Sequence, residues 1–327
     1  MKLFDGRSSQ QPSLSEQLND WLWPQLNSAL FGSSNRRSET GLSEVVVDPA
    51  SHFAGIGTLG CSKGYSTFKG SDLSESQLAT QKLILFGTGV GCEPPVQALP
   101  LAWDVRCVRG PLSARKLGLP ASKAITDATI LVAQVFEASS QAEGCSFIPD
   151  VHHANEADES WQRICEQANL RYIDPRWPIE KVLRAIASSE RVLAEEMQGA
   201  MLADALRIPW IPIVTSPRIC AFEWQDWCAS IELFYHPYRL PALKSYSRWD
   251  VGVHALQHWF SAALEGPAST PQYELFSAEN ILAQRLANIA KQAPTLSCDE
   301  TFSQKLEALQ ACFSQFCQQY ARDTVMH

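Results

Sequence analysis

The chain has 327 residues, of which 45% are hydrophobic and 19% are charged. This balance excludes an intrinsically disordered protein, because disorder needs low hydrophobicity and high net charge. Lys and Arg total 27 against 35 Asp and Glu, and the net charge of -8 argues against a nucleic-acid partner. At roughly 150 residues per domain, the length predicts two domains.

The 10 cysteines are scattered, and no two of them form a C-x-x-C pair. Their spacing gives no support to a metal site or a redox pair, and we expect free, mostly buried thiols. Residues 1–19 contain no apolar leader, and no run of about 18 apolar residues occurs. We expect a cytoplasmic protein whose membrane contact is at most peripheral, at the inner face of the plasma membrane.

The first predicted helix begins at Leu14. Ser13 and Glu16 form an S-x-x-E capping box, and apolar residues then recur at helical spacing. Two polar stretches indicate loops, at 31–41 and 62–76.

Short apolar runs then alternate with helical segments. The runs that indicate strands cover 83–86, 105–108, 146–148, 171–173, 192–193 and 210–214. The helical segments begin near Gly110-Pro111 and Asp127, and further ones cover 160–168, 179–186 and 199–206. This alternation is typical of βαβ units and predicts an α/β fold with largely parallel sheets.

The last part of the chain contains no convincing strand. Its helical spacing predicts helices over 253–264, 277–292 and 302–320. A polar stretch near 138–144 separates two groups of βα units. We therefore predict two Rossmann-like domains and a helical C-terminal segment, with bounds 1-142, 143-249 and 250-327.

A glycine turn, G-x-G-x-G, follows the strand that ends at Phe86. Glycines there let the backbone approach a ligand closely, and Gly87, Thr88 and Gly89 are the candidate contacts. The spacing differs from the G-x-G-x-x-G of dinucleotide sites. A tight turn without a ligand is the other interpretation, and both stay open.

Four basic residues gather in one strand-to-helix transition: Arg106, Arg109, Arg115 and Lys116. Arg109 comes where the strand ends and the helix begins, so its guanidinium and the helix N–H groups can converge on a phosphate or carboxylate. We expect Arg109 to serve a site, and Arg115 and Lys116 to form a solvated helix face.

Titratable side chains follow two later strands. His152 and His153 come after the strand that ends near Pro149. In one interpretation an imidazole exchanges protons there near pH 7. In the other, one histidine is structural and the other is exposed. Glu195 and Glu196 stand at a helix start, where the helix dipole stabilises carboxylates.

Three tryptophans either stack on a sugar ring or belong to the core: Trp177, Trp224 and Trp227.

The order of these motifs resembles that of the polysaccharide pyruvyltransferase family, in its succinoglycan-type exopolysaccharide branch. The residues that carry the resemblance are Gly55 to Leu59, Phe86 to Gly91, Val108 to Ala114, Thr126 to Ala128, Pro149 with His152-His153, Tyr172 to Pro175, and Val192 to Pro209. The resemblance spans roughly Leu14 to Leu240.

The resemblance implies a glycosyltransferase-B-like fold and transfer of a pyruvyl group from phosphoenolpyruvate to a sugar. The acceptor is a glycan or a lipid-linked oligosaccharide, the product is a ketal, and no cofactor or metal is expected. It implies catalytic roles for Arg109, as donor clamp, and for His152, His153 and Gln198. It implies substrate binding by Gly87, Thr88, Gly89, Gly110, Asp127, Glu196, Met197 and Gly199.

This chain departs from the family pattern at three places. Gln198 stands where members usually have the expected catalytic histidine, and Glu196 stands where many have arginine. The N-terminal motif, 13–19, lacks its glycine. Because glutamine does not exchange protons near pH 7, His152 or His153 then supplies the proton chemistry, or catalysis is altered or lost. The alternatives are a sugar-nucleotide glycosyltransferase and a non-catalytic relative.

Overall fold

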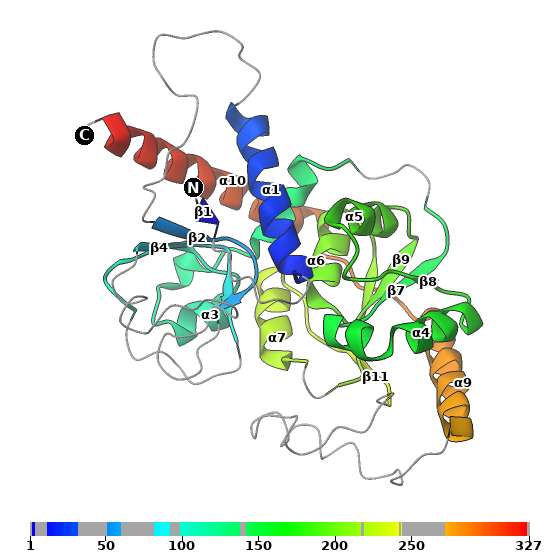
Figure 1. Ribbon diagram of the computed structural model, residues 1–327. Helices are drawn as coiled ribbons and strands as arrows, with labels where there is room; N and C mark the ends of the chain where they lie inside the picture. Colours follow the sequence, from blue (N-terminus) through cyan, green and yellow to red (C-terminus); the bar gives the residue numbers. More distant parts are fainter. Residues whose placement is uncertain are drawn as a thin grey trace. The chain divides into compact units, whose positions relative to one another are not determined.

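The computed structural model describes residues 2–3, 12–31, 51–59, 82–91, 99–137, 142–216, 219–241, 243 and 272–325 (Figure 1). The α/β prediction is confirmed, since every pairing between its named strands is parallel. The chain forms two compact units. The predicted helix at 253–264 and the predicted loop at 62–76 lie outside the described residues, as does the loop after Phe31.

The first unit takes its residues from Met1–Glu137, Phe222–Phe234 and Ser297–His327. Its main sheet has the order β1-β2-β4-β6, with bounds Lys2–Leu3, Ser51–Ala54, Lys82–Phe86 and Trp103–Cys107. A second pairing joins β3 (Thr58–Leu59) to β5 (Gly89–Val90). Its helical elements are α1 (Leu14–Phe31), α3 (Pro111–Lys116), η1 (Ala121–Lys123), η2 (Ala128–Gln134), α7 (Ala221–Ser230) and α10 (Asp299–Val325).

The predicted capping box begins α1. The Ser13 N–H donates to Glu16 Oε2 at 2.6 Å, and the Glu16 N–H donates to Ser13 Oγ at 3.3 Å. These reciprocal bonds satisfy two donors that a helix start leaves without partners. Leu14, Leu18 and Leu22 then face inward and are buried. The local sequence therefore fixes both the start of α1 and the face that it buries.

The second unit takes its residues from Ala138–Ala221 and Tyr235–Leu296. Its parallel sheet has the order β11-β10-β9-β7-β8. The strands are β7 (Cys145–Ile148), β8 (Arg171–Tyr172), β9 (Arg191–Ala194), β10 (Trp210–Val214) and β11 (Tyr238–Arg239). The helices are α4 (Val151–Gln167), α5 (Ile179–Ala187), α6 (Met197–Ala205) and α9 (Gln272–Ile289). The chain runs outward from β7 to β8 and then returns to β9 on the other side, so the strand order reverses between β7 and β9.

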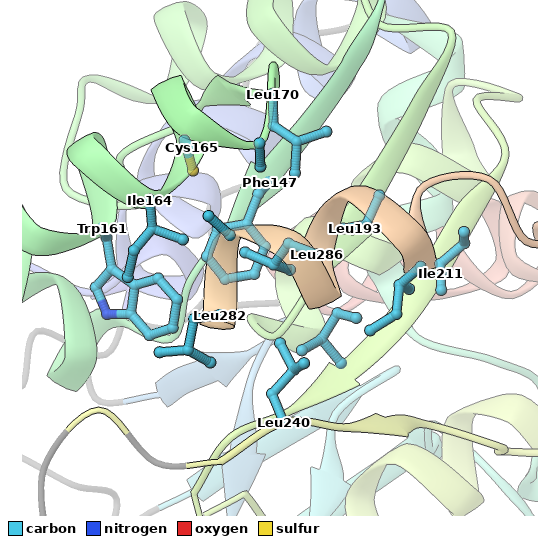
Figure 2. Close-up of a cluster of buried hydrophobic side chains, with 14 residues drawn as sticks. Phe147, Trp161, Ile164, Cys165, Leu170, Leu193, Ile211, Leu240, Leu282 and Leu286 are labelled. Atoms are coloured by element: carbon cyan, nitrogen blue, oxygen red, sulfur yellow. The ribbon is translucent and has the colours of Figure 1, made fainter. Parts of the chain in front are cut away.

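The core of the second unit lies between its sheet and two helices. Figure 2 shows side chains from β7, β9 and β10 meeting those of α4 and α9. Phe147 and Trp161 lie with ring centroids 5.2 Å apart, and Leu282 and Leu286 of α9 close the cluster. Each such buried side chain contributes roughly 1.5–3 kcal/mol. This core holds β7 and β9 side by side and so fixes their carboxyl ends.

Several elements differ from the sequence prediction. Helix α4 begins at Val151 rather than at 160, because Asp150 caps it by accepting the His152 N–H at 2.9 Å. The helix is interrupted at Ala157, whose backbone is not helical, so the predicted segment corresponds to the part after this break. Helix α7 was not predicted at all. The predicted terminal helices correspond to α9 and α10, with shifted ends.

The two units divide the chain differently from the bounds 1-142, 143-249 and 250-327. Helix α7 joins the first unit, where Asp226 caps α3. The C-terminal helices are shared, since α9 packs on α4 in the second unit and α10 belongs to the first. Among the described helices, none has a stretch long and apolar enough to cross a membrane. The expectation of free thiols fails at Cys220, which is disulfide-bonded.

Candidate functional site

Polar side chains gather at the carboxyl edge of the second unit's sheet. Asp150 and His153 follow β7, Glu195 and Glu196 follow β9, and Thr215 follows β10. The edge between β7 and β9 is where the strand order reverses. Open α/β sheets bind ligands outside such a reversal, because the connections leave in opposite directions and open a crevice there.

His153 and Glu195 form a buried pair at this edge. His153 Nδ1 lies 2.7 Å from Glu195 Oε2, and Glu195 is fully buried. Burial alone would raise the pKa of Glu195, but the hydrogen bond and charge of His153 turn the net shift downward. Burial lowers the pKa of His153, yet the Glu195 carboxylate outweighs it and the pKa is raised. Both shifts favour the charged pair.

The Glu195 carboxylate also ties three strand ends together. It accepts the backbone N–H of Asp150 at 3.1 Å and that of Thr215 at 3.0 Å, as well as the Thr215 hydroxyl. A buried carboxylate that accepts several hydrogen bonds is held in one orientation. Glu195 therefore acts as the structural centre of the edge.

Two further carboxyl groups at this edge have raised pKa values. Burial raises the pKa of Glu196 to about 8, and the neighbouring Asp150 charge adds to the shift. Burial and the Glu195 charge raise the pKa of Asp150 as well. Each carboxyl caps a helix, Glu196 by accepting the Gln198 N–H at 3.4 Å. Carboxyl groups that stay protonated near neutral pH are able to serve as general acids.

The remaining residues predicted in the second unit lie close to this edge. His152 is exposed on the first turn of α4, and Met197 is half-buried at the start of α6. Gln198 is buried. A Cβ on Gly199 would lie 2.8 Å from Ile148 Cγ2, so this glycine lets α6 pack against β7. Of the predicted histidines, the structure buries only His153.

Arg109 lies at the end of β6 in the first unit and is fully buried. Its Nη1 donates to Thr58 Oγ1 at 3.3 Å, its Nη2 to the Val90 carbonyl at 3.3 Å, and its Nε to Asp226 Oδ2 at 3.5 Å. Glu223 stands 3.9 Å from Nη1. All of these contacts are longer than the usual distance of about 2.9 Å. The charge of the guanidinium is thus balanced by nearby carboxylates, but its hydrogen bonds are long.

The side chain of Asp226, a residue of α7, lies at the start of α3. Its Oδ1 accepts the N–H of Leu112 at 2.8 Å and that of Ser113 at 2.9 Å, and its Oδ2 accepts the Ser113 hydroxyl. A Cβ on Gly110 would lie 2.2 Å from the Asp226 carbonyl oxygen. The structure therefore places a resident carboxylate, from α7, at the helix start where an anion is expected from the sequence.

The glycine turn after β4 is filled by protein atoms. Gly87 has φ +76, and a Cβ on it would lie 2.7 Å from the Ala128 nitrogen. A Cβ on Gly89 would lie 2.2 Å from the Arg109 guanidinium. Thr88 is buried and donates to the Gly57 carbonyl at 2.8 Å. These glycines make room for η2 and for Arg109, which accords with the interpretation as a tight turn.

Asp127 joins this group from the start of η2. It is buried, and its Oδ1 accepts the N–H of Thr129 at 3.0 Å and the Thr129 hydroxyl at 2.6 Å. No hydrogen-bond partner for its Oδ2 is found in the described part of the chain. Burial raises the pKa of Asp127, and the Arg109 charge opposes the shift. The first unit thus brings together the predicted residues that follow β4, the predicted Arg109 that follows β6, and Asp127.

The three tryptophans have different surroundings. Trp224 and Trp227 are buried and pack edge to face, with centroids 6.1 Å apart, so they belong to the core. Trp177 is partly exposed, and the Lys181 ammonium lies 3.5 Å from its ring centroid. Among the three, Trp177 alone presents its ring near the surface.

A comparison with known proteins shows which family the chain belongs to. The chain is 33% identical over 271 residues to the succinoglycan biosynthesis protein ExoV of Rhizobium meliloti (strain 1021). The match covers 81% of this chain and 74% of that protein. The chain belongs to the polysaccharide pyruvyltransferase family. No family model and no solved structure matches it.

Two of the three departures from the polysaccharide pyruvyltransferase pattern fall at the start of α6. Gln198, at the position of the family's histidine, is buried in the first turn, and Glu196 caps the same helix. Glu196 carries a proton near neutral pH, which Gln198 does not exchange. The two departures are therefore two residues apart on the edge where proton chemistry is expected.

Sequence reasoning missed several residues of the two groups. The sequence pattern does not single out Asp150 or Thr215, and it indicates Glu195 only as a carboxylate at a helix start. Each of the three lies one or two residues after the end of a strand. A position after a strand is also the feature that indicates His152 and His153. Asp226 gave no such signal. In the described ranges, no three His, Cys, Asp or Glu side chains are arranged to hold a metal ion.

Proposed function

We propose that this protein transfers a pyruvyl group from phosphoenolpyruvate to two hydroxyls of a sugar. The acceptor is a succinoglycan-type exopolysaccharide or its lipid-linked precursor, and the products are a pyruvate ketal and inorganic phosphate. The proposal rests on family membership and on similarity to a succinoglycan biosynthesis protein. The observation that supports it beyond membership is the pair of carboxyl groups with raised pKa values, Asp150 and Glu196, at the edge between β7 and β9.

The reaction requires proton transfers at defined atoms. One sugar hydroxyl adds to C2 of phosphoenolpyruvate, and C3 takes a proton to become a methyl group. The second hydroxyl then displaces phosphate from C2. Of the two hydroxyl protons released, one balances the methyl group and the other leaves on phosphate. An acid near C3 and a base near the first hydroxyl are therefore required.

Asp150 and Glu196 suit these two roles. Their like charges oppose each other, so ionisation of one favours protonation of the other. In the proposed mechanism Glu196 protonates C3, and the Asp150 carboxylate receives the proton of the attacking hydroxyl. His153 and Glu195 hold the strand ends that carry both groups. Gln198 contributes hydrogen bonds to the substrate.

Arg109 is the proposed cation for the donor's phosphate or carboxylate. Its hydrogen bonds to neutral acceptors are 3.3 Å long, whereas charge-assisted bonds to an oxyanion are about 2.7–2.9 Å. Exchanging long bonds for short ones favours anion binding. Asp226 and Glu223 balance the charge of Arg109 while no donor is bound.

The test follows phosphate release from phosphoenolpyruvate with glycan and lipid-linked oligosaccharide acceptors. Glu196→Gln keeps the shape but removes the acid, and we expect a fall in turnover of about 10²–10⁴-fold. Glu190→Gln is the matched control, since Glu190 is exposed and precedes β9 at the opposite edge. Equal activity of the two variants would refute the assignment of Glu196.

Thermal stability with each ligand, measured beside phosphate release, separates the alternatives. A sugar-nucleotide glycosyltransferase would be stabilised against heat by nucleoside diphosphates and not by phosphoenolpyruvate. A non-catalytic relative would bind phosphoenolpyruvate without releasing phosphate. Release that begins only in Gln198→His would show that the native site has lost its catalytic group. Release by the native protein, with phosphoenolpyruvate protection, supports the proposal.

A further inference from the structure

Helix α10 packs against strand β6 in the first unit through one anchored arginine. The register of β6 slips beside β4, so that Leu85 faces Val105 but Phe86 faces Cys107. Arg106 is the extra residue of this bulge. Its guanidinium lies 5.4 Å from the Phe316 ring centroid, and its Nη1 donates to Gln319 Oε1 at 2.8 Å. These contacts fix α10 over the end of β6.

The same packing places two thiols against each other. Cys107, the last residue of β6, is fully buried and is the hydrogen-bonding partner of Cys312 on α10. Cys312 lies one helical turn before Phe316 and is partly exposed. Both cysteines carry free thiols. The contact therefore joins a buried cysteine to a partly exposed one.

Charged side chains of both signs surround this pair: Lys123 and Arg106 are positive, and Asp104, which pairs with Arg106, is negative. Lys123 Nζ donates to the Val105 carbonyl at 2.7 Å and to the Arg106 carbonyl at 3.3 Å, which holds its ammonium beside the strand end. The hydrogen bond from Cys107, helped by the Lys123 and Arg106 charges, lowers the pKa of Cys312. The same hydrogen bond, followed by burial, raises the pKa of Cys107. These shifts favour the thiolate at Cys312 and the thiol at Cys107.

We propose that Cys107 and Cys312 form an oxidation site, at which a hydroperoxide converts the two thiols into a disulfide between β6 and α10. The Cys312 thiolate attacks the peroxide oxygen and becomes a sulfenic acid, with release of water from hydrogen peroxide. Cys107 sulfur then attacks Cys312 sulfur, and the sulfenic oxygen leaves as water with the Cys107 proton. In total, two thiols and one hydrogen peroxide give one disulfide and two waters.

The other described thiols do not share this arrangement. Cys317, also on α10, is buried, and burial raises its pKa to about 11. Cys298 is exposed, so peroxide reaches it too, and its hydrogen bonds with Thr301 lower its pKa. Its hydrogen-bonding partner among described residues is Thr301 rather than a second cysteine. Peroxide therefore gives a sulfenic acid at Cys298 and an internal disulfide at 107 and 312.

The cross-link acts on a strand that continues directly into Arg109. Closing the bond needs the sulfurs to approach to about 2.05 Å, which ties the end of β6 to α10. It also closes a long loop of chain and so restricts the unfolded state. The oxidised protein is expected to unfold at a higher temperature than the reduced one. This inference is independent of the proposed function.

The experiment treats the full chain with hydrogen peroxide and maps its tryptic peptides without reduction. Cleavage releases Cys107 on the peptide 107–109 and Cys312 on 306–322, which also carries Cys317. We expect these two peptides joined, and parted by a reductant. Cys317→Ser, the matched control on the same helix, must keep the link and the rise in unfolding temperature.

Cys312→Ser must lose both the link and the rise in unfolding temperature, while its reduced form unfolds near the native temperature. Two results would overturn the proposal. One is a joined peptide that persists in Cys312→Ser and vanishes in Cys317→Ser. The other is recovery of 107–109 unlinked after Cys298 has been fully oxidised.

Discussion

Asp226 fills the space that Gly110 leaves by having no side chain. The Asp226 carbonyl oxygen lies 2.2 Å from where a Gly110 Cβ would stand, and its carboxylate accepts two N–H groups at the start of α3. The same carboxylate faces the guanidinium of Arg109. One residue of α7 therefore fixes both the helix start and the buried cation of the first unit.

Gly110→Ala is expected to destabilise the protein strongly, since the added methyl group meets backbone rather than a flexible side-chain end. Gly118→Ala is the comparison. Gly118 has φ +66 and open space around it, so an alanine there costs only about 1–2 kcal/mol of backbone strain. Urea unfolding measures both. Equal losses for the two variants would contradict the packing of Gly110 against Asp226.

Asp226→Ala is expected to cost about 3–5 kcal/mol, because it leaves the buried Arg109 short of its nearest carboxylate and frees the N–H groups of α3. Glu307→Ala, on the exposed face of α10, serves as control and should change stability by no more than about 0.5 kcal/mol. The measurement is the shift in the free energy of unfolding. A loss below 1 kcal/mol, on the order of a surface change, would show that Asp226 is dispensable.

The acidic edge of the second unit predicts how stability depends on pH. Burial raises the pKa of Glu196 from 4.5 to about 8, so the folded state keeps a proton that the unfolded chain releases. The stabilisation is complete below the unfolded value and is lost as pH rises through the folded one. His153, whose pKa is also raised, contributes with the same sign.

Glu196→Gln should therefore flatten the decline in stability between pH 4.5 and about 8. Unfolding midpoints across this range measure the slope. Glu190→Gln, at the exposed opposite edge, should leave the slope of the native protein unchanged. A decline as steep in Glu196→Gln as in the native chain would place the responsible group elsewhere.

Glu195→Gln tests the buried pair. Without the carboxylate, the burial of His153 is no longer outweighed, and the pKa of His153 should fall below its ordinary value. Titration of the imidazole by NMR measures this directly. The variant should also lose stability by about 3–5 kcal/mol if the imidazole is charged in the native protein. An unchanged His153 titration would mean that Glu195 does not set its charge.

The sequence predicts the features that depend on neighbouring residues. The capping box at Ser13 and the strand that ends at Phe86 follow from local spacing. The position of His153 after a strand indicates a site residue, and the edge at which it lies follows from parallel βα units. For Glu195 the local sequence indicates only the helix that follows, since its partners His153 and Thr215 come from other strands.

The pairing of Asp226 with Gly110 could not be predicted, because the two residues are far apart in sequence and α7 lacks a clear amphipathic stripe. The role of Gly89 as space for Arg109 is hidden for the same reason. The contact between Cys107 and Cys312 depends on a strand bulge that no spacing rule reveals. Each of these features arises from packing between distant segments, which local propensity does not encode.

The most direct test of the proposed reaction follows the carbon skeleton of the donor. Phosphoenolpyruvate labelled with carbon-13 at C3 is incubated with the protein and a lipid-linked oligosaccharide in heavy water, and the products are observed by NMR. We expect a labelled ketal methyl group on the glycan that carries one deuterium, with one phosphate released per ketal and a large loss in Glu196→Gln. Label that stays in phosphoenolpyruvate, or appears only as free pyruvate, would contradict it.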